Sequence, residues 1–167
     1  VASAAVLWES FGTHNTPKVG ELVNNVSYSN GEITFTATHM KGNAVIAAKD
    51  ALGEILWSWH IWLTDQPTEQ EYFYDAGIMM DRNLGAISAN PGDIGALGLF
   101  YQWGRKDPFP PGNSSSVELP SGYSYDVALE NTTQRRVKYS KGIAYPKVFY
   151  SGVEDGGANR AWFNGNE

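Results

Sequence analysis

Residues 57–62 read WSWHIW, and their side chains could serve recognition or catalysis: three tryptophans and a histidine stand within six positions. Indole faces stack on sugar rings or fill a partner's pocket, and an imidazole can bind a metal or move a proton. On a strand, successive side chains point to opposite faces of the sheet. Trp57 and Trp59 therefore share one face, while His60 and Trp62 share the other.

Trp57 and Trp59 stand in one apolar row with three aliphatic residues of the same strand, Ile55, Ile61 and Leu63. Exposed apolar patches of that size are rare on soluble proteins. We therefore predict that both indoles are buried in the core.

His60 and Trp62 face the other side, where the neighbouring residues Ser58 and Thr64 are polar. A lone strand histidine is more often a hydrogen-bonded packing residue than a ligand. His60 and Trp62 are nevertheless the two members of the motif that we name as candidate ligand-binding residues.

Signatures of known catalytic sites are missing from the sequence. It has no Walker loop, no G-x-G-x-x-G after a strand and no G-x-S-x-G elbow, and its three histidines lack metal-ligand spacing. With no cysteine, thiolate chemistry and disulfides are excluded. A glycosidase-like carboxylate pair would need two of four nominal candidates, Asp75, Asp81, Asp93 and Glu118. We predict that the chain is not an enzyme and expect no cofactor.

Charge and hydropathy narrow the possible partners. The chain has 167 residues, with 18 acidic and 12 basic side chains and a net charge of −6. No basic cluster suggests nucleic-acid binding, and no apolar run is long enough to span a bilayer. The first residues, Val-Ala-Ser, indicate a processed product or an excised fragment.

Residues 1–66 show the pattern of an antiparallel β unit. In NNVSYSNGEITFTAT, Asn30-Gly31 is a preferred type I′ turn, which sets Tyr28 opposite Ile33 and Val26 opposite Phe35.

A second hairpin is expected around a loop at 50–53. It places Ala48 opposite Ile55, Ile46 opposite Trp57 and Ala44 opposite Trp59.

A new unit begins near residue 67. We predict a helix over 90–108, where Ile94, Leu97 and Tyr101 have helical spacing, and short strands at Arg136–Tyr139 and Lys147–Tyr150. In MMDRNLGA, we predict that Arg82 is a buried, fully paired guanidinium that organises loops.

Three strings in this order, ILWSWHIWLTD, MMDRNLGA and GALGLFYQWGRKDPF, resemble a family of Bacteroidetes surface proteins. These proteins are often fimbrillin-associated and similar in their later half to the Fibrobacter major-paralogous domain. The resemblance covers roughly residues 5–110. It implies a mainly β (α+β) fold: an immunoglobulin-like unit at 1–66 and a partial C-type-lectin-like unit with one short helix at 67–167, on the cell exterior. The family's later Cys-Pro-x-Gly-Trp stretch is missing, so the second unit looks incomplete.

The function that follows is extracellular adhesion or ligand binding, with a glycan or a surface protein as the partner. Calcium is possible, but the Glu-Pro-Asn and Trp-Asn-Asp motifs of calcium-dependent lectins are absent. The predicted ligand-binding residues lie in polar, loop-like stretches of the second unit: Trp162, Asn164, Tyr123, Tyr125 and Asp126. Two alternatives stay open. One is a pilus-type assembly subunit that pairs by its sheet edge and can form homo-assemblies, and the other is a carbohydrate-active enzyme.

Overall fold

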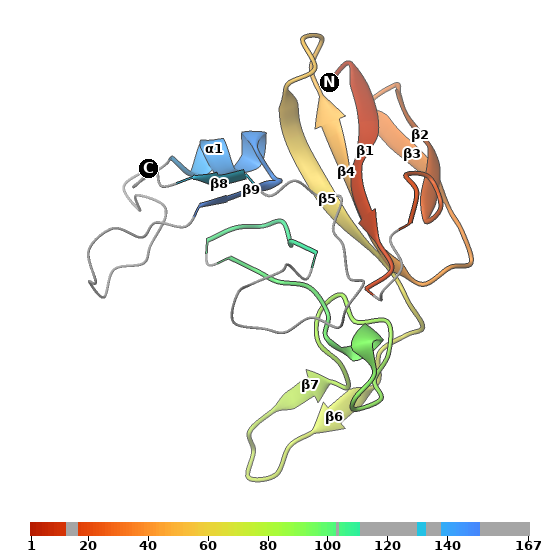
Figure 1. Ribbon diagram of the computed structural model, residues 1–167, viewed down its shortest axis with the longest axis vertical. Helices are drawn as coiled ribbons and strands as arrows, with labels where there is room; N and C mark the ends of the chain where they lie inside the picture. Colours follow the sequence, from red (N-terminus) through yellow and green to blue (C-terminus); the bar gives the residue numbers. More distant parts are fainter. Residues whose placement is uncertain (13–16, 103, 111–129, 133–137, 151–167) are drawn as a thin grey trace.

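The computed structural model describes residues 1–12, 17–102, 104–110, 130–132 and 138–150. In these residues the chain is mainly β, with one short α-helix (Figure 1). The prediction of a mainly β fold with one short helix is therefore confirmed. Among the described residues, no helix is long and apolar enough to cross a membrane.

Two antiparallel layers form the first part of the chain. Strands β1 (Ser3–Ser10), β4 (Gly42–Lys49) and β5 (Ile55–Leu63) make a sheet in the order β1-β4-β5. Strands β2 (Val23–Ser29) and β3 (Glu32–Ala37) form a hairpin whose strand β2 packs over β1 and β4. The layers therefore stack three strands against two.

The β2–β3 hairpin turns where the sequence predicts. Asn30 has a φ of 52° and Gly31 a φ of 86°, the left-handed pair that a type I′ turn requires. Tyr28 stands opposite Ile33, as expected. Along β2, exposed and partly buried residues alternate, because one face packs on the sheet and the other meets solvent.

Further from the turn, the register of this hairpin is irregular. It shifts between Asn24 and Ser27, so the predicted pairing of Val26 with Phe35 is not part of the regular ladder. The extra residue in β2 is typical of a β-bulge. Val26 still packs against the core.

The predicted register of β4 with β5 is wrong by two residues. Ile46 pairs with Trp59 instead of Trp57. The cause is the loop, which Asp50 closes by donating its backbone N–H to the Glu54 carbonyl at 3.0 Å, together with a bulge at the start of β5. A shift of two leaves each side chain of β5 on its predicted face.

The core between the layers is small. Leu22, Val23, Ala44 and Ile46 are buried there, and Ile33 and Ile61 are among the partly buried residues packed against them. Gly42 lies at its edge, where a Cβ atom would come within 2.6 Å of Leu22.

The buried carboxylate of Glu9 fixes the segment that leads from β1 to β2. Glu9 on β1 is 5% exposed and accepts the backbone N–H groups of Gly20, Glu21 and Val23 at 2.6–3.2 Å. Three N–H donors satisfy this charged group and fix the start of β2 on β1.

The predicted helix over 90–108 is wrong. The described residues of this segment contain a single helical turn, the 3-10 turn η1 (Ile94–Ala96), and Gly98 and Gly104 have φ of 75° and 79°, outside the helical range. A Cβ at position 98 would lie 2.6 Å from the Leu84 carbonyl. The backbone instead bonds to other segments: Leu99 donates to Leu84 at 2.9 Å.

The later elements are short. A hairpin pairs β6 (Glu69–Glu71) with β7 (Ile78–Met80), and β8 (Glu130–Thr132) pairs in parallel with β9 (Val148–Tyr150). The helix α1 (Tyr139–Ala144) lies next to β5 (Figure 1).

The prediction of a strand at Lys147–Tyr150 is confirmed by β9. Tyr139, however, begins α1 and does not end a strand. The guanidinium of Arg105 donates to the carbonyls of Tyr145, Pro146 and Val148 at 3.0 Å, and so fixes the segment after α1.

Candidate functional site

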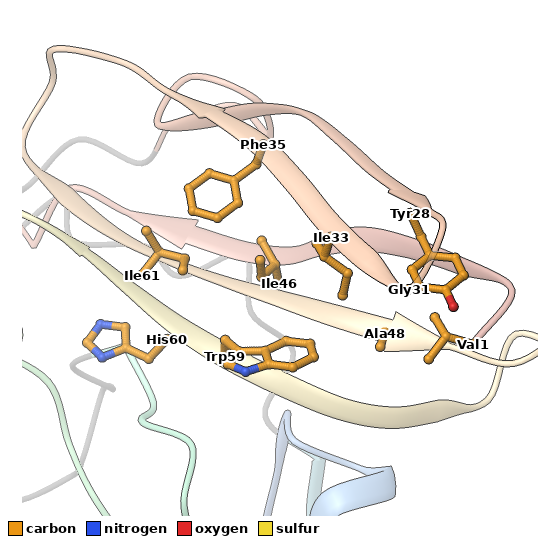
Figure 2. A pocket seen from close by; sticks show the side chains of 10 residues that line it. All are labelled: Val1, Tyr28, Gly31, Ile33, Phe35, Ile46, Ala48, Trp59, His60 and Ile61. Atoms are coloured by element: carbon orange, nitrogen blue, oxygen red, sulfur yellow. The ribbon is translucent and has the colours of Figure 1, made fainter.

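A cavity of about 420 Å³ lies between the β2–β3 hairpin and the edge of the sheet, and we call it the groove (Figure 2). The hairpin and the sheet supply its walls: Tyr28, Gly31, Ile33 and Phe35 from one side, and Ile46, Ala48, Trp59, His60 and Ile61 from the other, with Val1 at one end. Its volume lies in the range of small-molecule and side-chain pockets.

The groove exists because a two-stranded layer covers a three-stranded one incompletely. Strand β2 packs over β1 and β4, whereas β5 is the sheet edge furthest from β1. Trp59 on β5 is 42% exposed and Trp57 is 40% exposed. The prediction that both indoles are buried in the core is therefore wrong. The exposed face of β5 is a candidate recognition surface in addition to the predicted residues His60 and Trp62 and the predicted downstream loops.

The groove has an apolar interior. Phe35 and Ile33 point into it from the hairpin, opposite Ile46 and Trp59 (Figure 2). Tyr28 adds a phenol, and the lining residues include no Asp, Glu, Lys or Arg. This chemistry suits apolar or aromatic groups of a partner, which gain about 25 cal/mol for each Å² removed from water.

His60 borders the groove through its strand, but its ring points to the opposite side of the sheet (Figure 2). There, its Nε2 lies 2.9 Å from Oδ1 of Asn43, a fully buried residue whose Nδ2 donates to the Gly85 carbonyl at 2.8 Å. Burial lowers the pKa of His60 to about 4, and the Asp107 carboxylate acts in the opposite direction. At neutral pH the ring is uncharged and hydrogen-bonded within the chain.

Trp62, the other candidate of the motif, also contacts the downstream segment. Its indole N–H donates to the Ala86 carbonyl at 3.0 Å, and Ala86 is fully buried. The hydrogen-bonding groups of His60 and Trp62 thus serve packing between β5 and residues 85–86. A ligand-binding role for the two side chains stays a prediction.

Comparisons of the chain with protein-family models, with curated proteins and with solved structures give no match.

A polar cluster lies below Ser58 on the face that carries His60. The Ser58 hydroxyl donates to Asp107 at 2.9 Å, and the Lys106 ammonium donates to both Asp107 oxygens at 2.8 Å and to the Ser58 hydroxyl at 2.6 Å. A serine beside a lysine can act as a nucleophile and base. Here Ser58 is 3% exposed and Lys106 is paired with the Asp107 carboxylate, so this Ser58 cluster connects β5 to residues 106–107 and has a structural role.

The prediction that Arg82 is a buried, paired guanidinium is confirmed. Its side chain is 5% exposed and donates to both oxygens of Asp81, at 2.7 and 3.0 Å, and to the Thr64 hydroxyl at 3.2 Å. Asp65 adds a carboxylate 3.5 Å away. The guanidinium therefore connects the end of β5 to the end of β7.

Among the described residues, the carboxylates named as nominal catalytic candidates lie apart from the groove and have other roles or positions. Asp81 is paired with Arg82, Asp93 accepts the Ser88 hydroxyl at 2.6 Å, and Asp75 lies at the tip of the β6–β7 hairpin. In the described part of the chain, no three or more His, Asp or Glu side chains gather where a metal ion could bind. Six candidates lie outside the described residues: Glu118, Tyr123, Tyr125, Asp126, Trp162 and Asn164.

The groove residues Phe35, Tyr28 and Trp59 are missing from the sequence-based candidates. The available signal was the half-buried pattern of the hairpin together with a tryptophan-rich strand. Periodicity shows which residues share a face, but not how far a second layer extends over that face.

Proposed function

We propose that the chain is a non-enzymatic recognition module of the cell exterior that binds an extended, apolar segment of another protein in the groove. The observation that carries the proposal is the apolar groove beside β5, with Trp59 open to solvent at its wall. An aromatic and aliphatic lining of this kind is typical of sites that receive apolar side chains.

A protein segment fits this lining better than a glycan does. Sugars need several polar groups that fix their hydroxyls, and among the lining side chains that face the groove the polar groups are the Tyr28 phenol and the Trp59 indole N–H. An extended peptide can use backbone hydrogen bonds instead. In the described residues β3 pairs with β2 alone, which leaves its second edge available for strand addition next to the groove.

An assembly role is the second candidate, and the same free edge of β3 favours it. In that case, the bound segment would come from a neighbouring subunit of a fibre. A carbohydrate-active enzyme is less well supported, because the groove has no carboxylate in its lining.

The test is an NMR titration that follows the Trp59 indole N–H and the β3 amides. A synthetic peptide of alternating valine and threonine is the strand probe, and maltohexaose and cellohexaose are the sugar probes. We expect the peptide to shift the β3 and Trp59 signals and the sugars to leave them in place. If the sugars shift these signals and the peptide does not, the partner is a glycan and not a protein. If no probe shifts them, groove binding is refuted.

A matched pair of variants controls this experiment. Trp59→Ser removes a wall of the groove, whereas Trp57→Ser removes an equally exposed indole that is not among the lining residues. Only Trp59→Ser should weaken peptide binding. Equal losses in both variants would show that the peptide binds indoles without using the groove.

A further inference from the structure

The β6–β7 hairpin carries an exposed apolar surface at its end, and we call residues 72–80 the knob. Phe73 is 87% exposed and Tyr74 fully exposed, while Tyr72 and Ile78 are 49% and 64% exposed. The hairpin projects away from the β1-β4-β5 sheet (Figure 1). Contiguous exposed apolar groups of this kind mark interaction surfaces.

The knob has a defined shape. Tyr72 donates its backbone N–H to the Gly77 carbonyl at 3.0 Å, which closes the loop. Tyr74 and Asp75 have φ of 61° and 55°, the left-handed region that a tyrosine rarely adopts. Backbone strain of this kind concentrates at functional sites, and here it keeps aromatic side chains at the outer end of the hairpin.

The base of the knob is fixed to the sheet. The Thr68 hydroxyl donates to Asp81 at 2.9 Å, and the Asp81 backbone N–H donates to the Thr68 carbonyl at 3.0 Å. Asp81 in turn pairs with buried Arg82, which donates to Thr64 just beyond the end of β5. A preorganised knob loses less conformational entropy on binding than a flexible loop does.

We propose that the knob of one copy of the chain inserts into the groove of a second copy. The proposal rests on the proposed function, because it names the segment that the groove binds. A cavity of about 150 Å³ accepts a benzene ring, so the groove, at about 420 Å³, has room for two aromatic side chains such as Phe73 and Tyr74. Both surfaces are apolar, so each gains from being covered.

The positions of the two surfaces determine the kind of assembly. Val1, at one end of the groove, lies at the opposite end of the molecule from the knob (Figure 1). A knob therefore cannot fill the groove of its own chain. Contacts between two different surfaces of the same protein repeat head to tail and form open chains unless the rotation closes a ring.

Charge opposes the association of two copies and gives it a characteristic salt dependence. Glu69 and Glu71 lie on β6 just before the knob, Asp75 lies within it, and the net charge of the chain is −6. Two copies repel each other, so added salt should strengthen their association, whereas it would weaken binding to a basic protein. The same acidic residues disfavour an anionic lipid surface.

Sedimentation velocity on the full chain tests the proposal. At about 0.2 mM protein, we expect the average mass to rise about twofold or more over the monomer, and to rise further as salt increases. The knob variant Phe73→Ser/Tyr74→Ser and the groove variant Trp59→Ser should each stay monomeric. Their mixture should form dimers and nothing longer, because one working knob and one working groove remain. Leu52→Ser, at an 88% exposed site in the β4–β5 loop, should assemble like the parent chain.

A chain that stays monomeric at high salt, or a knob variant that assembles normally, would overturn the proposal. The mixture remains a valid test if either variant is less stable, provided that circular dichroism shows both to be folded. If the alternating peptide binds the groove while the chain stays monomeric, groove recognition stands and only the second copy is wrong. If the peptide also fails to bind, both proposals fall.

Discussion

The Ser58 hydroxyl on β5 donates to the Asp107 carboxylate at 2.9 Å, although 49 residues separate them in the sequence. Both side chains are almost fully buried. With the bonds from Asn43 on β4 to Gly85 and from Trp62 to Ala86, this contact assigns one face of the sheet to the downstream segment. The opposite face, with Trp59, is the one that remains accessible.

The Ser58 cluster should contribute strongly to stability. Asp107→Ala leaves the Lys106 ammonium without its carboxylate and the Ser58 hydroxyl without its acceptor. Since Lys106 keeps some contact with water, we expect a loss of about 3 kcal/mol, at the lower end of the range for broken buried pairs. Urea unfolding measures it. Glu69→Ala, at an exposed site, should change stability by less than about 0.5 kcal/mol. A similarly small change for Asp107→Ala would show that the Ser58 cluster contributes little to stability.

Trp62→Phe keeps an aromatic ring but removes the indole N–H. The Ala86 carbonyl would then lose its donor at a buried position, and we expect a destabilisation of about 1–3 kcal/mol. Trp57→Phe is the control and should destabilise the chain less, because it keeps an aromatic face for the Lys106 ammonium, which lies 4.6 Å from the centre of the Trp57 ring. Equal losses would mean that the hydrogen bond to Ala86 contributes nothing beyond the lost ring volume.

His60 should make the fold sensitive to mild acid. Its pKa is about 4 in the folded chain against an ordinary value of 6.5, so the unfolded chain takes up the proton first as the pH falls. The contribution of the neutral ring is complete above pH 6.5 and is lost as the pH falls toward 4. We expect the free energy of unfolding to fall by about 2 kcal/mol over this range, a figure reduced to allow for the partial exposure of the ring. Unfolding at several pH values measures it.

Two histidine variants isolate this effect. His60→Gln should unfold with a flatter pH dependence between 4 and 6.5, whereas His39→Gln, at an exposed site, should behave like the parent chain. An NMR titration that places the midpoint of His60 near 6.5 would contradict the assignment.

Stronger acid should act through Asp81. Hydrogen bonds from Arg82 hold the pKa of this carboxyl well below its ordinary value of 3.8. The stabilisation is therefore present above that value and is lost as the pH falls further. Asp81→Asn should lower the urea midpoint at pH 7 and reduce its fall between about pH 4 and 2. An unchanged acid dependence in Asp81→Asn would assign the acid sensitivity to other carboxylates, with Asp65 as the next candidate because its bond to Lys41 lowers its pKa to about 2.

Predictions that depend on local chemistry agree with the structure. The Asn30-Gly31 turn has the backbone angles that its residues favour. Arg82 is buried and paired, because a guanidinium next to an aspartate near a strand end finds its acceptor close by. The faces of β5 also follow the alternation of its residues.

Predictions that depend on distant contacts fail. Helical spacing around Ile94 and Leu97 was outweighed by Gly98, whose φ of 75° and close approach to the Leu84 carbonyl no helix permits. The β4–β5 register differs for a local reason, because Asp50 closes a longer loop than the one expected.

The sequence by itself determined that this chain is mainly β, where its main hairpins turn, and that Trp57 and Trp59 face away from His60 and Trp62. Only the tertiary structure decided which of these two faces is covered. Alternation is a property of neighbouring residues, but exposure depends on how far another layer extends. Here the β2–β3 hairpin stops short of β5, while Ala86 and Asp107 contact the opposite face of β5.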